Sequence, residues 1–293
     1  MLAAILTTCM FAVSAVCAHR SAAMLGGATA NLARLLLAAA LLAVWAHGFG
    51  AGLGGAALPV FLLSGVVGFG VGDLGFFQAL PRLGSRLTVL IAQCMAVPIA
   101  AMTEWLWLGT GLTLSQGFWC GWILAGVGIA LTPVRDLGRS GYRLSGILYA
   151  VMAAGGQGMG AVMSRKAFAM AAAASESVDG MSAAYQRILG GLLVAFLGWW
   201  VARWRCRERG PRRPRGAWAW VAGNSLAGPV LGVTCYQWAL KTTPTGLVLS
   251  IVAITPLLVI PLAAWIEHER PTRRSLAGGA VAVAGAIALA LGR

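Results

Sequence analysis

Charged residues are scarce in this sequence. Asp, Glu, Lys and Arg make up only 10% of its 293 residues, whereas a soluble domain contains about 25%. Hydrophobic residues reach 59%, and a soluble globule of this length cannot bury so much apolar surface, because much of its side-chain area stays in water. The composition therefore excludes an ordinary soluble enzyme and indicates a chain that lies in lipid.

Paired cysteines and catalytic motifs are also missing. The six cysteines show no C-x-x-C and no paired spacing, which excludes a disulfide framework and a zinc site. There is no G-x-x-x-x-G-K-S/T loop, no G-x-S-x-G and no H-E-x-x-H. We therefore expect no enzyme activity, no cofactor, and no catalytic or metal-binding residue. His268 lies between Glu267 and Glu269; a solvated polar turn is favoured there over a proton or metal site.

Long apolar runs fill almost the whole chain. Each is close to the ~17–25 residues that a membrane-spanning helix requires. None alternates polar and apolar residues as a barrel strand would. We therefore predict an all-α integral membrane protein with ten transmembrane helices. The runs cover residues 2–18, 28–46, 57–80, 87–108, 117–132, 144–163, 182–202, 217–239, 245–266 and 275–291.

The basic residues are distributed unevenly between the two sides of these runs. Of the 22 Lys and Arg, 16 lie in loops after the odd-numbered runs, 4 lie on the opposite side, and Arg34 and Arg187 lie within runs. Loops rich in Lys and Arg resist translocation, so we predict that both termini are periplasmic. The net charge of +14 then faces anionic lipid, and no nucleic-acid partner is needed to explain it. Arginine outnumbers lysine 20 to 2, which is typical of a GC-rich bacterium, so the expected location is a bacterial inner membrane.

The two halves of the chain share a weak sequence pattern. The sequence FQAL at residues 77–80 recurs as YQWAL at residues 236–240, and Pro98 matches Pro256 at an offset of 158. Each half contains five runs, and an odd number makes the second half enter the membrane upside down. This pattern predicts an inverted 5+5 repeat, which is the architecture of many secondary transporters. The two expected repeats are residues 1–136 and 142–293.

Two longer segments carry a resemblance to a known family. Residues 87–131 (LTVLIAQCMAVPIAAMTEWLWLGTGLTLSQGFWCGWILAGVGIAL) and 247–289 (LVLSIVAITPLLVIPLAAWIEHERPTRRSLAGGAVAVAGAIAL) share a Pro within a helix, an aliphatic run, a polar corner and a Gly-rich helix. Both resemble the helix 4–5 block of the drug/metabolite transporter superfamily, EamA type. At its corner the first copy reads GTG at residues 109–111, where the family usually has Glu, whereas the second copy keeps Glu269. The resemblance implies ten helices around a central cavity and the export or uptake of small metabolites.

Four charged residues lie inside the expected spans, where each costs about 2.5–3.5 kcal/mol at a helix centre. Counting along the runs puts Arg34 and Asp73 at matching depth near the inner face, and Arg187 and Glu104 at matching depth near the outer face. We therefore expect two ion pairs, which would gate the two mouths of the cavity. The alternative is that each arginine extends to its nearby interface and each acid lies in a hydrated vestibule. For Glu104 this alternative is the stronger one, because Trp105 follows it.

Uncharged polar residues within the runs are further candidates for the cavity wall. Structural hydrogen bonds between helices are the alternative role for each of them. Gln93 and Gln157 stand out because they lie near mid-span, where transporters bind their substrates. Nine residues are candidates. We assign five of them to the cavity, Gln93, Gln157, Tyr185, Asn224 and Gln237, and the other four are Asn31, Gln78, Gln186 and Tyr236.

These observations predict a secondary transporter that moves a small amino-acid-like, polar or amphipathic metabolite by alternating access, with export as the expected direction. Asp73 or Glu104 would carry the proton if transport is proton-coupled, since a carboxylate away from water takes up a proton more easily. The expected partners are a small-molecule substrate and the lipid bilayer, and the chain would be a monomer or a homodimer. The alternatives are a lipid-linked flippase or a passive facilitator and, less favoured, a membrane-embedded enzyme or an assembly subunit.

Overall fold

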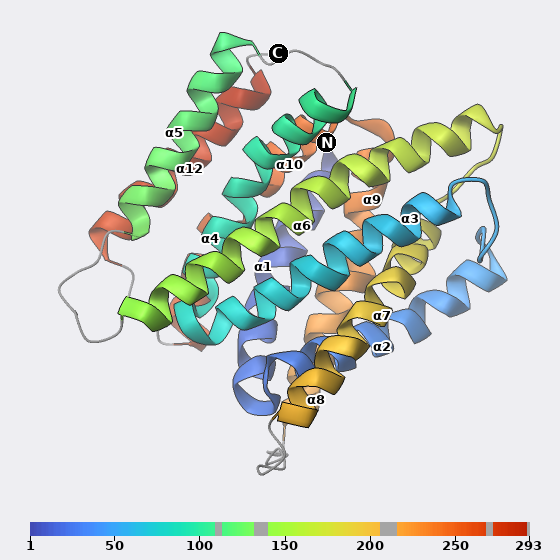
Figure 1. Cartoon of the computed structure of the whole chain (residues 1–293), viewed down its shortest axis with the longest axis horizontal. Coiled ribbons are helices and arrows are strands. Elements are labelled where there is room, and N and C mark those ends of the chain that lie inside the picture. Colours follow the sequence, from blue (N-terminus) through green and yellow to red (C-terminus); the bar gives the residue numbers. More distant parts are fainter. Residues whose placement is uncertain (109–112, 132–139, 206–215, 268–271, 292–293) are drawn as a thin grey trace.

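The computed structural model describes residues 1–108, 113–131, 140–205, 216–267 and 272–291, and within these ranges every regular element is a helix (Figure 1). Lipid offers no water to the backbone, so each segment satisfies its own hydrogen bonds by coiling. The elements are α1 (Leu2–Leu25), α2 (Gly27–Gly48), α3 (Leu58–Gly65), η1 (Val66–Gly72), α4 (Asp73–Leu108), α5 (Leu114–Leu131), α6 (Ser140–Ala173), α7 (Gly180–Arg205), α8 (Ala217–Ser225), η3 (Leu226–Gly232), α9 (Val233–Thr242), α10 (Thr245–Val252), α11 (Thr255–Ile266) and α12 (Arg273–Leu291).

Several helical segments are long and apolar enough to cross a membrane. Among the described residues there are six of them, and two shorter apolar helices cover Gly117–Val127 and Leu276–Leu289. The prediction of an all-α, multi-span membrane protein is therefore confirmed. Its finer form, ten transmembrane helices in two inverted repeats, stays a prediction. The six segments are Leu2–Leu25, Gly27–Gly48, Leu58–Trp107, Leu144–Ala173, Gly180–Trp204 and Thr245–Ile266.

The segment Leu58–Trp107 is 50 residues long and is bent at Gly84. This residue has φ 77° and ψ 170°, outside the helical range. A side chain is strained at such a positive φ, whereas glycine adopts it readily. The bend falls between the two runs expected at residues 57–80 and 87–108, so it divides one continuous apolar segment into two helical parts.

Two π-helical segments occupy corresponding places in the two halves of the chain. η1 (Val66–Gly72) and η3 (Leu226–Gly232) are each seven residues long, and each leads directly into an α-helix. They are separated by an offset of 160 residues at both ends. The π-helix is a rare and wide form of helix that is found frequently at functional sites. The hydrophobic pattern of the sequence does not indicate either segment.

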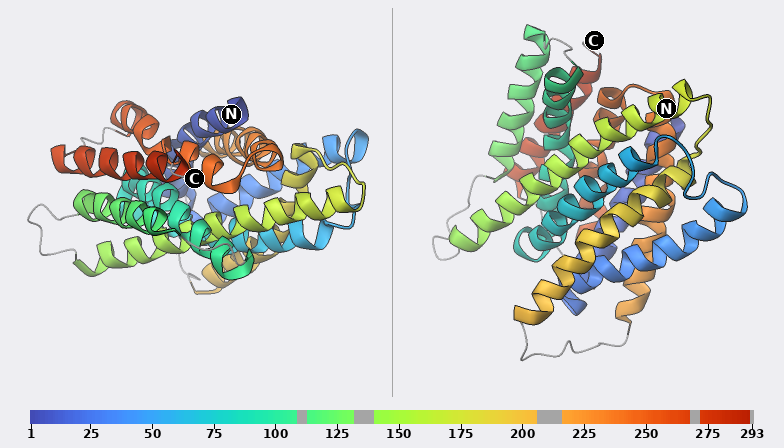
Figure 2. Two further views of the ribbon diagram at one scale, coloured as in Figure 1. Left: turned by 90° about the horizontal axis from the view of Figure 1, so that it is seen from above. Right: turned by 45° about the vertical axis from the view of Figure 1, so that its right-hand side comes forward.

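Helices from the two halves pack against each other crosswise. α1 and α2 contact α8 and η3, while α6 and α7 contact α3 and η1. α2 also contacts α7, and α5 pairs with α12 at one side of the molecule (Figure 2). The largest buried apolar cluster joins α4 and α6 to α5, α9, α10 and α12. Helices of both halves also enclose a pocket, whose wall carries the polar residues described next.

Candidate functional site

A pocket lies between the two halves of the chain, and its charged residues belong to segments of membrane-spanning length. It holds about 800 Å³ of space, part of which is open to the outside. Its wall comes from α1, α2, η1, the first turns and middle of α4, α6, α7, α8, η3 and α9. The wall combines aromatic rings, namely Phe11, Phe69, Phe76, Phe77 and Tyr236, with polar side chains, namely Ser14, Arg34, Asp73, Gln93, Gln157, Arg187 and Asn224.

Arg34 and Asp73 form an ion pair at this pocket, through Nη2 of the arginine and Oδ2 of the aspartate. Nε of Arg34 also donates a hydrogen bond to Asn31 Oδ1 at 3.1 Å, and the guanidinium lies 4.9 Å from the ring centre of Phe77. Ser225 Oγ donates to the backbone oxygen of Arg34 at 3.0 Å. The charge is thus paired and held in place, and the first of the two expected ion pairs is present.

Arg187 is the second buried arginine of the pocket, and it is only 4% exposed. A Cβ at Gly65 would lie 1.7 Å from the backbone oxygen of Arg187, so α3 and α7 approach each other at backbone distance. A Cβ at Gly68 would lie 2.8 Å, and one at Gly160 3.2 Å, from Arg187 Nη2. The guanidinium therefore lies over these glycines, 5.3 Å from the ring centre of Phe69.

The described residues show no ion pair between Arg187 and Glu104, which we expected to meet. Glu104 does not line the pocket, and the ion pairs found among the described residues are those of Arg34 with Asp73 and of His19 with Glu267. Arg187 instead lies near enough to Asp73 and Tyr236 to interact with them electrostatically. Counting residues gives the depth of a side chain along a helix but not the direction in which it points around the axis.

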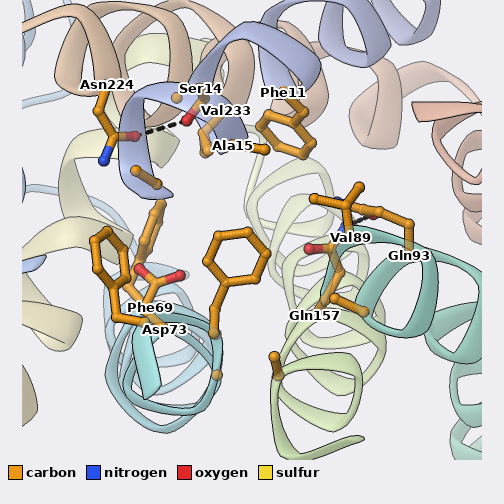
Figure 3. Close-up of a pocket in the computed structure, with 18 of the residues that line it drawn as sticks. Phe11, Ser14, Ala15, Phe69, Asp73, Val89, Gln93, Gln157, Asn224 and Val233 are labelled. Atoms are coloured by element: carbon orange, nitrogen blue, oxygen red, sulfur yellow. Dashed lines mark hydrogen bonds between the residues drawn. The ribbon is translucent and has the colours of Figure 1, made fainter. Parts of the chain in front are cut away.

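The uncharged candidates divide into two groups. Gln157 Nε2 donates to Gln93 Oε1 on the wall opposite Asp73 (Figure 3), and Asn224 Oδ1 accepts a hydrogen bond from Ser14 Oγ at 2.7 Å. These three expected residues line the pocket together with Arg34, Asp73 and Arg187. Their role in transport stays a prediction.

Two further candidates lie away from the pocket wall. Tyr185 has its hydroxyl 3.2 Å from His47 Nε2, and this contact joins α7 to the end of α2. Gln237 is fully buried, and neither of its amide atoms has a hydrogen-bond partner among the described residues. Neither residue lines the pocket.

Sequence reasoning did not single out the aromatic part of the wall. Phe11 and Phe69 line the pocket, but a phenylalanine that faces a cavity has the same sequence signal as one that faces lipid. Tyr236 is among the nine polar candidates of the sequence but not among the five assigned to the cavity, although its position beside Gln237 in the repeated YQWAL motif is a usable signal. Its hydroxyl is buried and has no hydrogen-bond partner among the described residues.

A second polar cluster lies beside the bend at Gly84. Glu267 Oε1 is 3.0 Å from His19 Nδ1, and the glutamate side chain is only 3% exposed. Ser85 Oγ donates to the other carboxylate oxygen at 2.7 Å. The carboxylate of Glu267 thus joins α1 to α4. The expectation of a solvated turn concerns His268, which lies outside the described residues together with Glu269.

Comparison with known proteins finds a family and a similar fold. The model of a family described as the EamA-like transporter family matches residues 144–291. A solved structure described only as "Crystal structure of protein" is similar over 98% of this chain and 95% of that chain, with a TM-score of 0.65 and 18% identity. At this identity the likeness concerns the fold alone. No curated protein matches the sequence.

Proposed function

The chain belongs to the EamA-like transporter family, and we propose that it is a secondary transporter which moves a small polar or amphipathic metabolite across a bacterial inner membrane. The observation that carries this proposal is a pocket with buried charged groups inside membrane-length helices. Charges are expensive in hydrocarbon and are retained there for substrate or ion pathways. A pocket lined by both halves of the chain is also where secondary transporters bind their substrates.

The proposed architecture is ten transmembrane helices in two inverted repeats, residues 1–136 and 142–293, with both termini periplasmic. It is supported by the two π-helices at an offset of 160 residues and by the crosswise packing of the two halves. Arg34 and Arg187 add to this support, since each is the eighth residue of its helix. The backbone oxygen of each arginine also contacts the third helical segment of the other half, at Ser225 and at Gly65.

The proposed mechanism is alternating access, in which one side of the pocket is closed while the other is open. The Arg34–Asp73 pair joins α2 to the start of α4, and it would close the cytoplasmic side in the predicted orientation. Opening this side requires the pair to separate. A proton on Asp73 would neutralise the carboxylate and weaken the pair, which gives a route to proton coupling. Export is the proposed direction.

Transport by the purified protein in proteoliposomes tests this proposal. We expect counterflow of at least one solute from a panel of amino acids, organic anions, cations and sugars, at a rate above that of empty liposomes. Asp73→Asn should reduce this rate, whereas Glu176→Gln, which changes an exposed acid outside the pocket, should not. Absence of counterflow for every solute, together with movement or conversion of a lipid, would contradict a metabolite transporter and favour a flippase or a membrane enzyme.

A further inference from the structure

The pocket contains one more positive group than negative groups. Its charged side chains are Arg34, Arg187 and Asp73, and Asp73 makes its ion pair with Arg34. Within the described part of the chain no ion pair reaches Arg187, which is 4% exposed. A buried cation that makes no ion pair of its own is costly, because it has lost its water and has a counter-charge, that of Asp73, only at longer range. A negative group on the solute would supply a close counter-charge.

Three hydrogen-bonding groups of the same pocket point to the same kind of solute. Arg187 Nε, the Tyr236 hydroxyl and Asn224 Nδ2 are buried, and none has a hydrogen-bond partner among the described residues. Tyr236 is 3% exposed and Asn224 is fully buried. The guanidinium and the amide nitrogen can only donate, and the phenol can donate as well. Such a set of donors fits a group with several acceptor oxygens, such as a carboxylate or a sulfonate.

The rest of the wall indicates what the negative group is attached to. The rings of Phe11, Phe69, Phe76 and Phe77 line the pocket, and Phe69 lies under the guanidinium of Arg187 at 5.3 Å. These rings give an apolar surface next to the donors, which an inorganic anion would leave unused. A dianion would exceed the single positive charge that remains after Asp73 has paired with Arg34.

We propose that this pocket binds an organic monoanion, whose carboxylate or sulfonate contacts Arg187 and Tyr236 and whose apolar body packs on the phenylalanine rings. This inference rests on the proposed transport function and adds the substrate class to it. A cation is disfavoured, because the carboxylate of Asp73 is engaged by Arg34 and Arg187 lies nearby. A neutral solute of the same shape lacks the counter-charge for Arg187.

Three probes with one benzene ring and different charge test the substrate class. Benzenesulfonate is the anion, benzenesulfonamide the neutral analogue and benzyltrimethylammonium the cation. Binding to the purified full-length protein in neutral detergent can be measured by isothermal titration calorimetry. We expect benzenesulfonate to bind at least about tenfold more tightly than the other two, since one charge-assisted contact accounts for such a factor.

Substitutions then locate the binding site. Arg187→Gln should weaken benzenesulfonate binding about 10- to 100-fold, and Arg187→Lys should weaken it less, because the charge is kept while the planar geometry is lost. Tyr236→Phe should weaken binding about 2- to 10-fold without changing the shape of the pocket. Arg203→Gln is the matched control, since Arg203 is an exposed arginine on the same helix and does not line the pocket. Thermal melting of each variant separates lost binding from lost folding, and Tyr236→Phe supplies the test if Arg187→Gln does not fold.

The outcomes separate this inference from the proposed function. Equal binding of the three probes, or an Arg187→Gln variant that binds benzenesulfonate as the Arg203→Gln control does, would overturn the anion site. Displacement of benzenesulfonate by an equimolar amount of phosphatidylglycerol would assign the donors to a lipid headgroup and would also overturn it. Counterflow of neutral or cationic solutes alone would leave the transport function standing and refute only the substrate class. Counterflow of no solute at all would refute the transport function itself.

Discussion

Arg34 and Arg187 occupy the same place in their helices, yet their surroundings differ. Arg34 has an aspartate, an asparagine oxygen and a phenylalanine ring around its guanidinium. Arg187 has two glycines and a phenylalanine ring, with Asp73 at longer range. The first arginine is therefore satisfied by the protein, whereas the second depends on what enters the pocket. Arginine at equivalent positions of the two halves can therefore form a contact that closes the pocket in one half and bind the solute in the other.

Asp179 gives a prediction for a single residue outside the membrane-spanning helices. Its Oδ1 accepts hydrogen bonds from the backbone nitrogens of Met181 and Ser182, at 2.9 and 3.0 Å, so it caps the start of α7. Burial alone would raise the pKa of Asp179, but hydrogen bonds from Ser182 and Met181 outweigh burial and hold its pKa below the ordinary value of 3.8. We expect Asp179→Ala to lower the free energy of unfolding by about 1 kcal/mol at pH 7.

The pH dependence of this effect follows from the direction of the pKa shift. A lowered pKa in the folded state means that the ionised carboxylate adds stability at pH values above about 4, and that this contribution disappears as the pH falls through the folded-state pKa. The gap in melting temperature between the native protein and Asp179→Ala should therefore narrow below pH 4. Asp179→Asn, which keeps the capping oxygen without the charge, should lie between them and lack this pH dependence. A gap of the same size at pH 7 and pH 3 would contradict the assignment.

Among the helices, the pair α5 and α12 depends on small residues. A Cβ at Gly126 would lie 2.4 Å from the backbone nitrogen of Ala282, and a Cβ at Gly278 would lie 2.4 Å from that of Ala130. Backbone atoms cannot move aside as a flexible side chain can, so the helices would have to separate. Close approach of this kind at small residues is a main source of helix association in lipid, where apolar contacts with lipid tails compete with contacts between helices.

Gly126→Ala tests this packing and has a matched control on the same helix. We expect it to lower the free energy of unfolding by about 1–3 kcal/mol, as overpacking does in other proteins. A Cβ at Gly121 would meet nothing within 4 Å, so Gly121→Ala should be neutral or slightly stabilising through the higher helix propensity of alanine. Unfolding in a mixed detergent titration, followed by tryptophan fluorescence, measures both. Equal stabilities of the two variants would mean that α5 and α12 do not pack as described.

The bend at Gly84 gives a second prediction for the helices. Alanine at this position would have to adopt φ near 77° with ψ near 170°, a region that is essentially restricted to glycine and costs a residue with a Cβ about 1–3 kcal/mol. Gly84→Ala should therefore destabilise the protein by this amount in the same detergent titration. Gly48→Ala, at a glycine with no positive φ and nothing within 4 Å, should have little effect. If the two substitutions have the same effect, the bend does not depend on the conformational freedom of Gly84.

The positions of the helices could be predicted from the sequence because length and hydropathy determine which segments can enter lipid. Even so, α1 continues to Leu25, past Arg20, since a charge ends the apolar stretch but not the hydrogen bonding of a helix. The π-helices could not be predicted, because a change in backbone hydrogen bonding leaves no hydrophobic pattern. Depth along the helix predicted that Arg34 and Asp73 would meet. The same argument does not give the position of Glu104, which lies outside the pocket, because rotation about the helix axis depends on packing that only the folded chain defines.

For the molecule as a whole, the proposed inverted repeat makes Arg34 and Arg187 alternative partners of the same carboxylate, that of Asp73. Asp73 forms its ion pair with Arg34 and also interacts electrostatically with Arg187. In alternating access the two halves would exchange conformations. The contact that Arg34 forms to close the pocket in one state would then have a counterpart near Arg187 in the opposite state. The pair described here would then be specific to one of the two states.

Exchange of the two charges at the pair tests whether it acts as a gate. Arg34→Asp and Asp73→Arg each place two like charges together in a low-dielectric site, so each should reduce counterflow at least about tenfold, because like-charge contacts cost several kcal/mol. The double variant restores opposite charges and should recover a measurable part of the rate, with a melting temperature closer to that of the native protein. Arg203→Asp, on an exposed arginine outside the pocket, controls for charge reversal. Normal counterflow in both single variants would exclude the gate, because opening and closing would then proceed without this contact.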